Sequence, residues 1–312
     1  MNGFARNGHF VLHTSDRDLA DYVLKYRPIG KFYARHRIVE MAKELQPDLV
    51  LLIHADLIDS ETIARVRERA PGCRVACIDF DLITYPVVAS RVRRMMEFCD
   101  FGFATTGGSP LQALSGGKPM HFIPNVVDIA MDDQQSYRNE PTCDVFFAGK
   151  MSDDKYQWQR ALALQRLAPE LTYFYAGSKT SQTQSPGGIW GYAFIRQLGH
   201  SKIGLNLNRV EGDLSSSSRM AQYLGNGCLL ATDRASGFEE FFPDDAMIFF
   251  SGPEELAERC RGILADGESW RVMAERGRAR AIELMSNTLV CRFIEAVTTG
   301  ARVPQEWRFT GR

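Results

Sequence analysis

The residues between Ser201 and Asp233 combine serines, an arginine and glycines in a spacing suited to holding an anion. An apolar run, Lys202–Leu207, is followed by a polar stretch that ends in four consecutive serines. A helix that begins at these serines has amide groups without intrahelical partners and the positive end of the helix dipole, and it can bind a phosphate. The predicted diphosphate site comprises Ser216, Ser217, Ser218 and Arg219. The alternative is a solvated serine loop that supplies one N-cap.

Polar residues also follow neighbouring apolar runs, and open parallel sheets bind their ligands at the carboxyl ends of strands. Gly149 and Lys150 follow the run Asp144–Ala148. The glycine allows a phosphate to approach the backbone closely, and the lysine can meet its charge. Asn208 and Arg209 follow the run before the serines, so we count them with the same anion site. A plain turn with solvated side chains is the alternative for each pair.

The elements that would position these residues alternate along the chain. Apolar runs typical of buried parallel strands are separated by amphipathic segments such as Lys31–Leu45 and Val87–Phe98. Strands alternating with helices at short spacing predict an α/β fold with two Rossmann-like, doubly wound parallel-sheet domains. We also expect a short strand at His9–His13. The polar stretch Asp128–Thr142 is typical of a linker, which divides the chain into residues 1–135, 136–286 and a helical tail, 287–312.

The composition excludes several classes of protein. The chain has 312 residues, 45% of them hydrophobic and 24% charged, and a formal net charge of −1, without the basic half expected of a nucleic-acid binder. No apolar run approaches the ~20 residues of a membrane span, and no signal-peptide core is present. The seven cysteines form no C-x-x-C pair, which favours buried thiols of a cytoplasmic protein over disulfides or a zinc site.

The segment SKIGLNLN, the later SSRMAQYLGNGCLLATD and the following GFEEFF resemble the C-terminal domain of GT-B glycosyltransferases. The resemblance is closest to the family typified by the CgeB-like spore-coat maturation proteins. It implies two domains that face a cleft. The usual first strand and helix are missing or shortened before Gly8, so either the N-terminal domain is abbreviated or another element fills the gap. It further implies transfer of a sugar from a nucleotide-diphosphate sugar such as a UDP-sugar to an acceptor hydroxyl, in the synthesis of a cell-surface glycan. No cofactor and no metal is implied.

The resemblance also assigns roles to single residues. Arg219 matches the family's arginine at the diphosphate, and Gln222 stands where an acid usually holds the ribose. Glu211 is the nearest match to the glutamate that lies near the donor sugar in retaining enzymes, and Gly149 matches a glycine that faces the cleft. Pro124–Asp128 matches a P-N-x-x-D segment at the domain boundary, to which we assign a hinge role.

An inverting transferase also needs a general base for the acceptor hydroxyl, and His or Asp can serve. Strand ends of the first domain offer His54 with Asp56 and Asp79 with Asp81, each pair two residues apart and so on one side of an extended chain. We predict His54, Asp56 or Asp81 as the base; capping of loops is the alternative for the acids. Arg91, Arg93 and Arg94 form a basic cluster that predicts either peripheral membrane contact or a solvated helix face.

Two other functions stay open at this stage. A sugar-nucleotide epimerase can use the same architecture, and it would interconvert sugars without an acceptor. A catalytically silent surface-assembly or partner-binding protein is favoured by Gln222 in place of the acid and by the missing first unit. The sequence gives no indication of the oligomeric state, the sugar or the acceptor.

Overall fold

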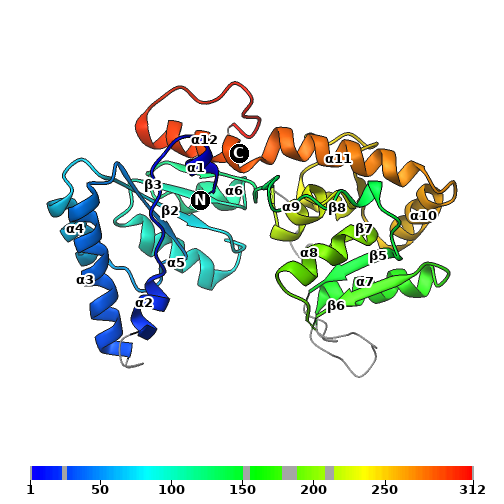
Figure 1. Ribbon diagram of the computed structural model, residues 1–312, viewed down its shortest axis with the longest axis horizontal. Coiled ribbons are helices and arrows are strands. Elements are labelled where there is room, and N and C mark those ends of the chain that lie inside the picture. The colour runs from blue at the N-terminus through cyan, green and yellow to red at the C-terminus, as the bar shows by residue number, and fades with distance from the viewer. Residues whose placement is uncertain (1, 23–26, 150–154, 178–187, 208–213, 311–312) are drawn as a thin grey trace. The chain divides into compact units, whose positions relative to one another are not determined.

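The computed structural model describes residues 2–22, 27–149, 155–177, 188–207 and 214–310. Its strands form two parallel sheets (Figure 1). The chain divides into two compact units. The first comprises Met1–Ile123, Cys291–Gln305 and Phe309–Arg312, and the second comprises Pro124–Val290 and Glu306–Arg308. The C-terminal helix α12, Asn287–Thr299, therefore begins in the second unit and contributes its later residues to the first.

The first unit contains a four-stranded sheet in the order β1-β2-β3-β4 with parallel pairing throughout. Besides the later part of α12, its elements are α1 (Asn2–Arg6), α2 (Asp16–Tyr22), α3 (Arg27–Leu45), β1 (Leu49–Ile53), α4 (Ser60–Arg69), β2 (Arg74–Asp79), α5 (Pro86–Met96), β3 (Phe101–Ala104), α6 (Ser109–Leu114) and β4 (Met120–Phe122). After Arg74, every residue of β2 is buried, because helices cover both faces of a parallel sheet.

The second unit contains a five-stranded parallel sheet in the order β6-β5-β7-β8-β9. Its elements are η1 (Ser136–Arg138), β5 (Cys143–Ala148), α7 (Tyr156–Leu167), β6 (Tyr173–Ala176), α8 (Tyr192–Gly199), β7 (Ser201–Asn206), α9 (Ser218–Gly225), β8 (Leu229–Asp233), η2 (Arg234–Ser236), β9 (Ile248–Phe250), α10 (Pro253–Leu264), α11 (Ser269–Met285) and the start of α12. Strand β6 lies on one side of β5, and the chain then returns to place β7 on the other side. The strand order therefore reverses between β5 and β7.

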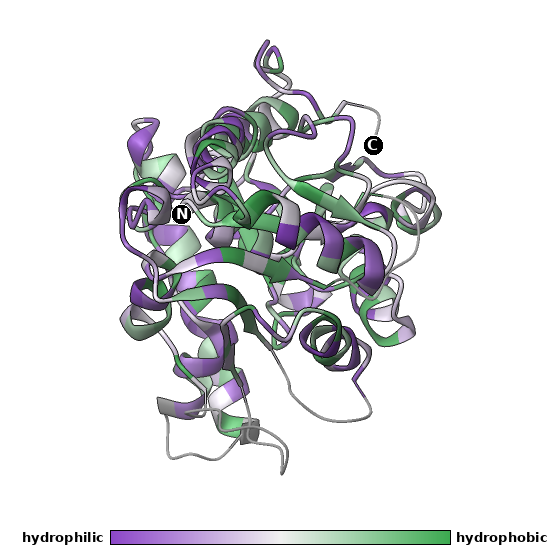
Figure 2. Ribbon diagram, turned by 90° about the vertical axis from the view of Figure 1, so that its right-hand side faces the viewer, coloured by the Kyte–Doolittle hydropathy of each residue, from purple (hydrophilic) through white to green (hydrophobic). Residues whose placement is uncertain are grey.

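Hydropathy follows these layers, as Figure 2 shows: the strands are mostly hydrophobic, and hydrophilic residues gather on the helices. In the second unit, one face of the sheet packs Phe147 against Trp158 of α7, and the opposite face packs Phe146 against Tyr223 of α9. Successive residues of a strand point to opposite faces, so β5 supplies both layers of the core. The two parallel sheets confirm the predicted α/β class.

Gly204 of β7 allows helix α9 to lie directly on the sheet. A Cβ atom at this position would come within 2.5 Å of the Tyr223 ring. Replacing Gly204 with Ala is therefore expected to overpack the core and to lower the stability of the second unit by about 1–3 kcal/mol. Gly262 of α10 is the matched control, because an added Cβ there meets nothing within 4 Å, and Ala favours a helix by about 1 kcal/mol over Gly.

The measurement is urea unfolding followed by tryptophan fluorescence. All four tryptophans, Trp158, Trp190, Trp270 and Trp307, belong to the second unit, so this signal reports on that unit. We expect opposite shifts of the midpoint: downward for Gly204→Ala and upward for Gly262→Ala. An unchanged midpoint in Gly204→Ala would show that Tyr223 does not pack as described.

The first unit differs from the sequence prediction at its start. The strand expected at His9–His13 does not form; these residues are irregular, and Phe10 and Leu12 are exposed. A strand forms only when its backbone bonds a neighbouring strand. His9–His13 does not join the edge of β1, which is paired with β2 on one side only. The expected helix at Lys31–Leu45 begins earlier, at Arg27.

All seven cysteines are free and buried, as the sequence predicted: Cys73, Cys77, Cys99, Cys143, Cys228, Cys260 and Cys291. Burial raises the pKa of Cys73 and Cys143, and it raises the pKa of Cys260 to about 12. These thiols therefore stay protonated and unreactive near neutral pH. Among the described helices, none combines the length and apolar character needed to cross a bilayer.

Candidate functional site

The reversal of strand order between β5 and β7 is where an open α/β sheet forms a ligand site at its carboxyl edge. Gly149 follows β5 directly, and α9 begins after the loop that follows β7. The sequence thus brings Gly149 and the serine-rich helix start to one edge of one sheet. Lys150, Asn208, Arg209 and Glu211 lie outside the described residues.

Ser217 is the N-cap of α9. Its hydroxyl accepts a hydrogen bond from the Met220 backbone amide (3.2 Å) and donates one to Asn206 Oδ1 (2.7 Å). The Asn206 amide in turn donates to Thr232 Oγ1 (3.0 Å), so the helix start is tied to the ends of β7 and β8. Capping of this kind stabilises a helix by about 1 kcal/mol. Ser217 therefore fixes the position of the helix start, and its neighbour Ser218 is exposed at the first helical position.

Ser216 is buried and is bonded to the segment that precedes the second unit's sheet. Its hydroxyl accepts a hydrogen bond from the Asn125 backbone amide (2.8 Å), and its carbonyl accepts one from the Asn125 side chain (3.0 Å). This pair joins the Pro124–Asp128 segment to the loop before α9 within one unit. Of the predicted serines, Ser216 and Ser217 thus have structural partners, and Ser218 is the one exposed to solvent.

Arg219 is half-buried against the end of β5. Its guanidinium donates to the carbonyl of Ala148 (3.1 Å) and to that of Leu207 (3.5 Å), and it lies 5.5 Å from the centre of the Phe147 ring. A Cβ on Gly149 would come within 3.2 Å of Arg219 Nη1, so the glycine leaves room for this side chain. Burial lowers the pKa of Arg219. Within the described ranges, no ion pair includes Arg219.

This arrangement places a cation where backbone carbonyls orient it without neutralising it. Burying a charge without a partner is costly. Since no carboxylate among the described residues pairs with Arg219, an anionic ligand here would supply an opposite charge. Gln222 lies one turn further along α9, on the same side as Arg219. Gln222 is half-buried, so part of its side chain is accessible to solvent.

The first unit brings His54, Asp79 and Asp81 together at the carboxyl ends of β1 and β2. His54 Nδ1 lies 3.9 Å from Asp79 Oδ1 and 3.8 Å from Asp81 Oδ2. His54 has a left-handed backbone with φ of 48°, a conformation that costs about 1 kcal/mol or more outside glycine and often marks functional sites. Asp79 is 4% exposed and Asp81 is 55% exposed.

Arg91 of α5 organises these carboxylates. Its guanidinium bonds Asp79 through Nε (2.8 Å) and Nη2 (2.7 Å), and Nη2 also bonds Asp81 Oδ2 (2.7 Å). Burial disfavours the charge of Arg91, but its hydrogen bonds to Asp81 and Asp79 outweigh that effect and raise its pKa. The basic cluster predicted from sequence is therefore wrong for Arg91, which is paired inside the unit; Arg93 and Arg94 are exposed.

Sequence reasoning missed Arg91 because it was grouped with its basic neighbours. The signal was its helical spacing: Arg91 falls between the buried residues Val88, Val92 and Met95, so its stem starts beside the sheet-facing side of α5. Asp79 is the last residue of β2, where every residue after Arg74 is buried. A buried carboxylate is rarely found without a paired cation, so its position predicted a partner such as Arg91.

Asp56 does not join His54. It forms an ion pair with Arg17 of α2, and the nearby Asp16 carboxylate accepts a hydrogen bond from the Leu57 amide (3.1 Å). The left-handed turn at His54 directs the chain away from the straight extension that the sequence argument assumed. His54, Asp79 and Asp81 could offer a metal ion three ligand atoms within 4.8 Å of one another, but Arg91 already bonds both carboxylates.

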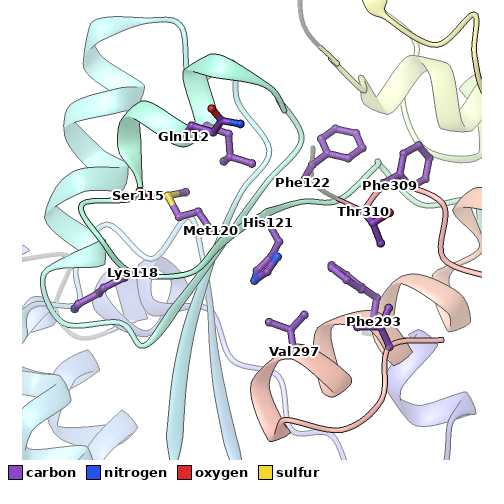
Figure 3. A pocket seen from close by; sticks show the side chains of 12 residues that line it. Gln112, Ser115, Lys118, Met120, His121, Phe122, Phe293, Val297, Phe309 and Thr310 are labelled. Carbon is purple, nitrogen blue, oxygen red and sulfur yellow. The ribbon is translucent and has the colours of Figure 1, made fainter. Parts of the chain in front are cut away.

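A pocket of about 510 Å³ lies elsewhere in the first unit, between β4, α6, α12 and the C-terminal segment (Figure 3). The His121 ring contacts Phe293 and Phe103 edge-on or tilted, and burial lowers the pKa of His121. Lys118 points away from the pocket and bonds carbonyls at the end of α5 (Figure 3). An apolar lining with a neutral histidine suits an apolar group better than an anion.

Comparison with known proteins agrees with this geometry. Residues 148–294 match a protein-family model described as "Glycosyl transferase-like". No curated protein sequence matches the chain. The match covers β5's last residue, the helix start at Ser218 and the strands on either side, which are the elements of the Arg219 site.

Solved structures share this fold at low sequence identity. HepE of Anabaena, in complex with UDP and glucose, is 12% identical with a TM-score of 0.62, over 87% of this chain and 83% of that one. An alpha-glucosyltransferase in complex with UDP-glucose and DNA containing an abasic site is 12% identical with a TM-score of 0.62, over 85% and 83%. Sucrose-phosphate synthase of Thermosynechococcus elongatus is 11% identical with a TM-score of 0.57, over 86% and 78%.

The fold is therefore that of the GT-B glycosyltransferases, as the sequence resemblance implied. The glycosyltransferase-like family match, residues 148–294, covers most of the second unit and ends four residues into the first unit, within α12. Neither finding singles out the CgeB-like proteins among the families of this fold.

Proposed function

We propose that this chain is a glycosyltransferase that moves a sugar, a hexose in the first instance, from a nucleoside-diphosphate sugar to an acceptor hydroxyl. The observation that carries the proposal is Arg219: a half-buried cation, held by two backbone carbonyls beside Gly149, at the point where the strand order reverses. The diphosphate would lie against the Arg219 guanidinium and the exposed first turn of α9. Gln222 would then donate or accept a hydrogen bond at the ribose.

The family match favours glycosyl transfer over the epimerase and over the silent binding protein. Crystal structures of the same fold hold UDP or UDP-glucose, which makes UDP the first ligand to test. Transfer through this site is proposed to need no bound metal. Arg219 supplies the positive charge at the phosphates, and Arg91 already pairs the acids of the His54 cluster.

In this proposal His54 takes the proton from the acceptor hydroxyl. Its Nδ1 faces Asp79 and Asp81, whose negative charge would stabilise the imidazolium that forms. Asp79 is saturated by Arg91 and the Asp81 amide, which leaves His54 as the better base. Glu211, which the resemblance places near the donor sugar, is the other residue whose replacement should be tested for sugar transfer.

The proposal is tested by titrating UDP into the protein and into Arg219→Ala. Hydrogen bonds to a charged group contribute about 1.5–3 kcal/mol, so the substitution is expected to weaken UDP binding roughly 10- to 100-fold. Arg166→Ala is the matched control, because Arg166 is an exposed arginine on α7 of the same unit. Equal UDP affinities of the Arg219→Ala variant and the control would contradict the proposed diphosphate site.

A further inference from the structure

The pocket along β4 has the size of a ligand site but takes no part in the proposed transfer. Its volume of about 510 Å³ falls within the ~300–1,000 Å³ of small-molecule sites. It lies along β4 at one edge of the sheet, whereas His54 and Asp81 lie at the ends of β1 and β2, and β3 separates the two places. A ligand in this pocket would therefore be independent of the acceptor, and its assignment does not rest on the proposed function.

The walls of this pocket offer no charge to a ligand. Among the described residues that line it, none is acidic. Lys118 bonds the carbonyls of Met96, Glu97 and Cys99, and in Figure 3 its side chain points away from the pocket. An ion that entered would lose its hydration and meet no opposite charge, which is costly. The lining therefore selects an uncharged ligand.

Two pairs of aromatic rings line the pocket. Phe122 and Phe309 meet edge to face, with ring centres 5.3 Å apart and planes at 62°. His121 and Phe293 form a second such pair, with ring centres 5.8 Å apart and planes at 83°. In Figure 3 the first pair lies above the second. Because edge-to-face contacts add to the energy of burial, this lining favours a further aromatic ring over an alkyl chain of the same area.

His121 supplies the pocket with an unused hydrogen-bonding group. Its half-buried ring projects from β4 toward Val297 and Phe293 of α12 (Figure 3). The ring contacts Phe103 and Phe293, and no hydrogen bond joins either ring nitrogen to another described residue. Burial lowers the pKa of His121, so the ring is uncharged near neutral pH. A neutral imidazole has one N–H donor and one nitrogen acceptor, and a hydroxyl group can complement either.

We propose that the pocket between β4, α6 and α12 binds an uncharged aromatic compound that carries a hydroxyl group. The ring of the compound would lie among Phe122, Phe293 and Phe309, and its hydroxyl would bond the His121 ring. A bare hydrocarbon would leave the histidine nitrogens without a partner, and a carboxylate would bring a charge that nothing in the lining balances.

The test uses β-naphthol, whose fluorescence anisotropy rises when it binds a protein. Naphthalene, octanol and β-naphthoate then compete with it, and each departs from the proposed ligand in one feature. Naphthalene, which lacks the hydroxyl, is expected to bind roughly 2- to 10-fold more weakly. Octanol, which lacks the ring, should bind more weakly by a similar factor. β-Naphthoate carries a charge in place of the hydroxyl and should bind at least about tenfold more weakly than β-naphthol.

Two substitutions locate this binding in the pocket. His121→Phe keeps a ring at this position but removes the hydrogen bond, so it should weaken β-naphthol binding about 2- to 10-fold and leave naphthalene binding unchanged. Val297→Trp fills the pocket with an indole and should abolish binding of both compounds. Val87→Trp is the matched control, because Val87 is 80% exposed on α5 of the same unit; it should bind both compounds like the unaltered protein.

The proposal is overturned if β-naphthoate or octanol binds as tightly as β-naphthol, if β-naphthol does not bind up to its solubility limit, or if Val297→Trp and Val87→Trp show equal losses. The comparison in His121→Phe does not require that Val297→Trp folds. An equal loss of β-naphthol and naphthalene binding in His121→Phe would show that His121 makes no hydrogen bond to the hydroxyl, and it would equally reject the proposal.

Discussion

Replacing His54 with Gln is expected to lower the rate of sugar transfer by about 10²–10⁴-fold, the usual contribution of a general base. Glutamine keeps hydrogen-bonding capacity near Asp79 and Asp81 but cannot accept the acceptor proton. UDP affinity should stay unchanged, because the donor site is built from α9 and the end of β5 in the second unit. The measurement is release of UDP from UDP-glucose with and without candidate acceptors, alongside UDP titration.

The control for this variant is His200→Gln, since His200 is an exposed histidine in the second unit whose backbone bonds its neighbours. Full transfer activity in His54→Gln would rule out His54 as the base. A loss of transfer together with a loss of UDP affinity would indicate that the substitution disturbs the fold instead. Asp81→Asn is expected to give a smaller loss, because Asp81 is half-exposed and acts through His54.

The second large effect concerns stability. Replacing Asp79 with Leu should lower the free energy of unfolding of the first unit by about 3–5 kcal/mol, the cost of leaving a buried ion without its partner. Arg91 would then keep one weak, half-exposed partner, Asp81, in place of the two-bonded Asp79. Arg91→Met is expected to lower the stability of the first unit for the same reason, because it leaves the buried Asp79 carboxylate without its cation.

The double variant Asp79→Leu/Arg91→Met separates the ion pair from simple packing. Replacing both partners with apolar groups of similar size can be nearly neutral, so the double variant should be more stable than either single one. Unfolding is followed by far-ultraviolet circular dichroism, because the tryptophans all belong to the other unit. Additive losses in the double variant would contradict a coupled pair.

The fold class could be predicted because strand and helix patterns alternate along the whole chain. Runs such as Leu49–Ile53 are recovered residue for residue as β1, since a buried parallel strand is apolar on both faces. The segment at His9–His13 has the same local pattern but forms no strand. Pairing depends on a neighbouring strand, which local pattern does not reveal.

The candidate site was predictable only where its residues follow one another in sequence. The serines and Arg219 occupy a helix start, as the N-cap pattern indicated. The His54 cluster depends on three segments and on a left-handed turn at His54, and neither the turn nor the reach of Arg91 from α5 is encoded in a short motif. Spacing alone paired His54 with Asp56, whereas Asp56 is bound by Arg17.

The seven buried cysteines can report how often each part of the chain opens locally. Cys73, Cys77, Cys99 and Cys291 belong to the first unit, and Cys143, Cys228 and Cys260 belong to the second. A thiol reagent can modify each one only when its surroundings transiently unfold. Mass spectrometry of labelled peptides would therefore measure the rate of local opening of each unit separately, with no added probe.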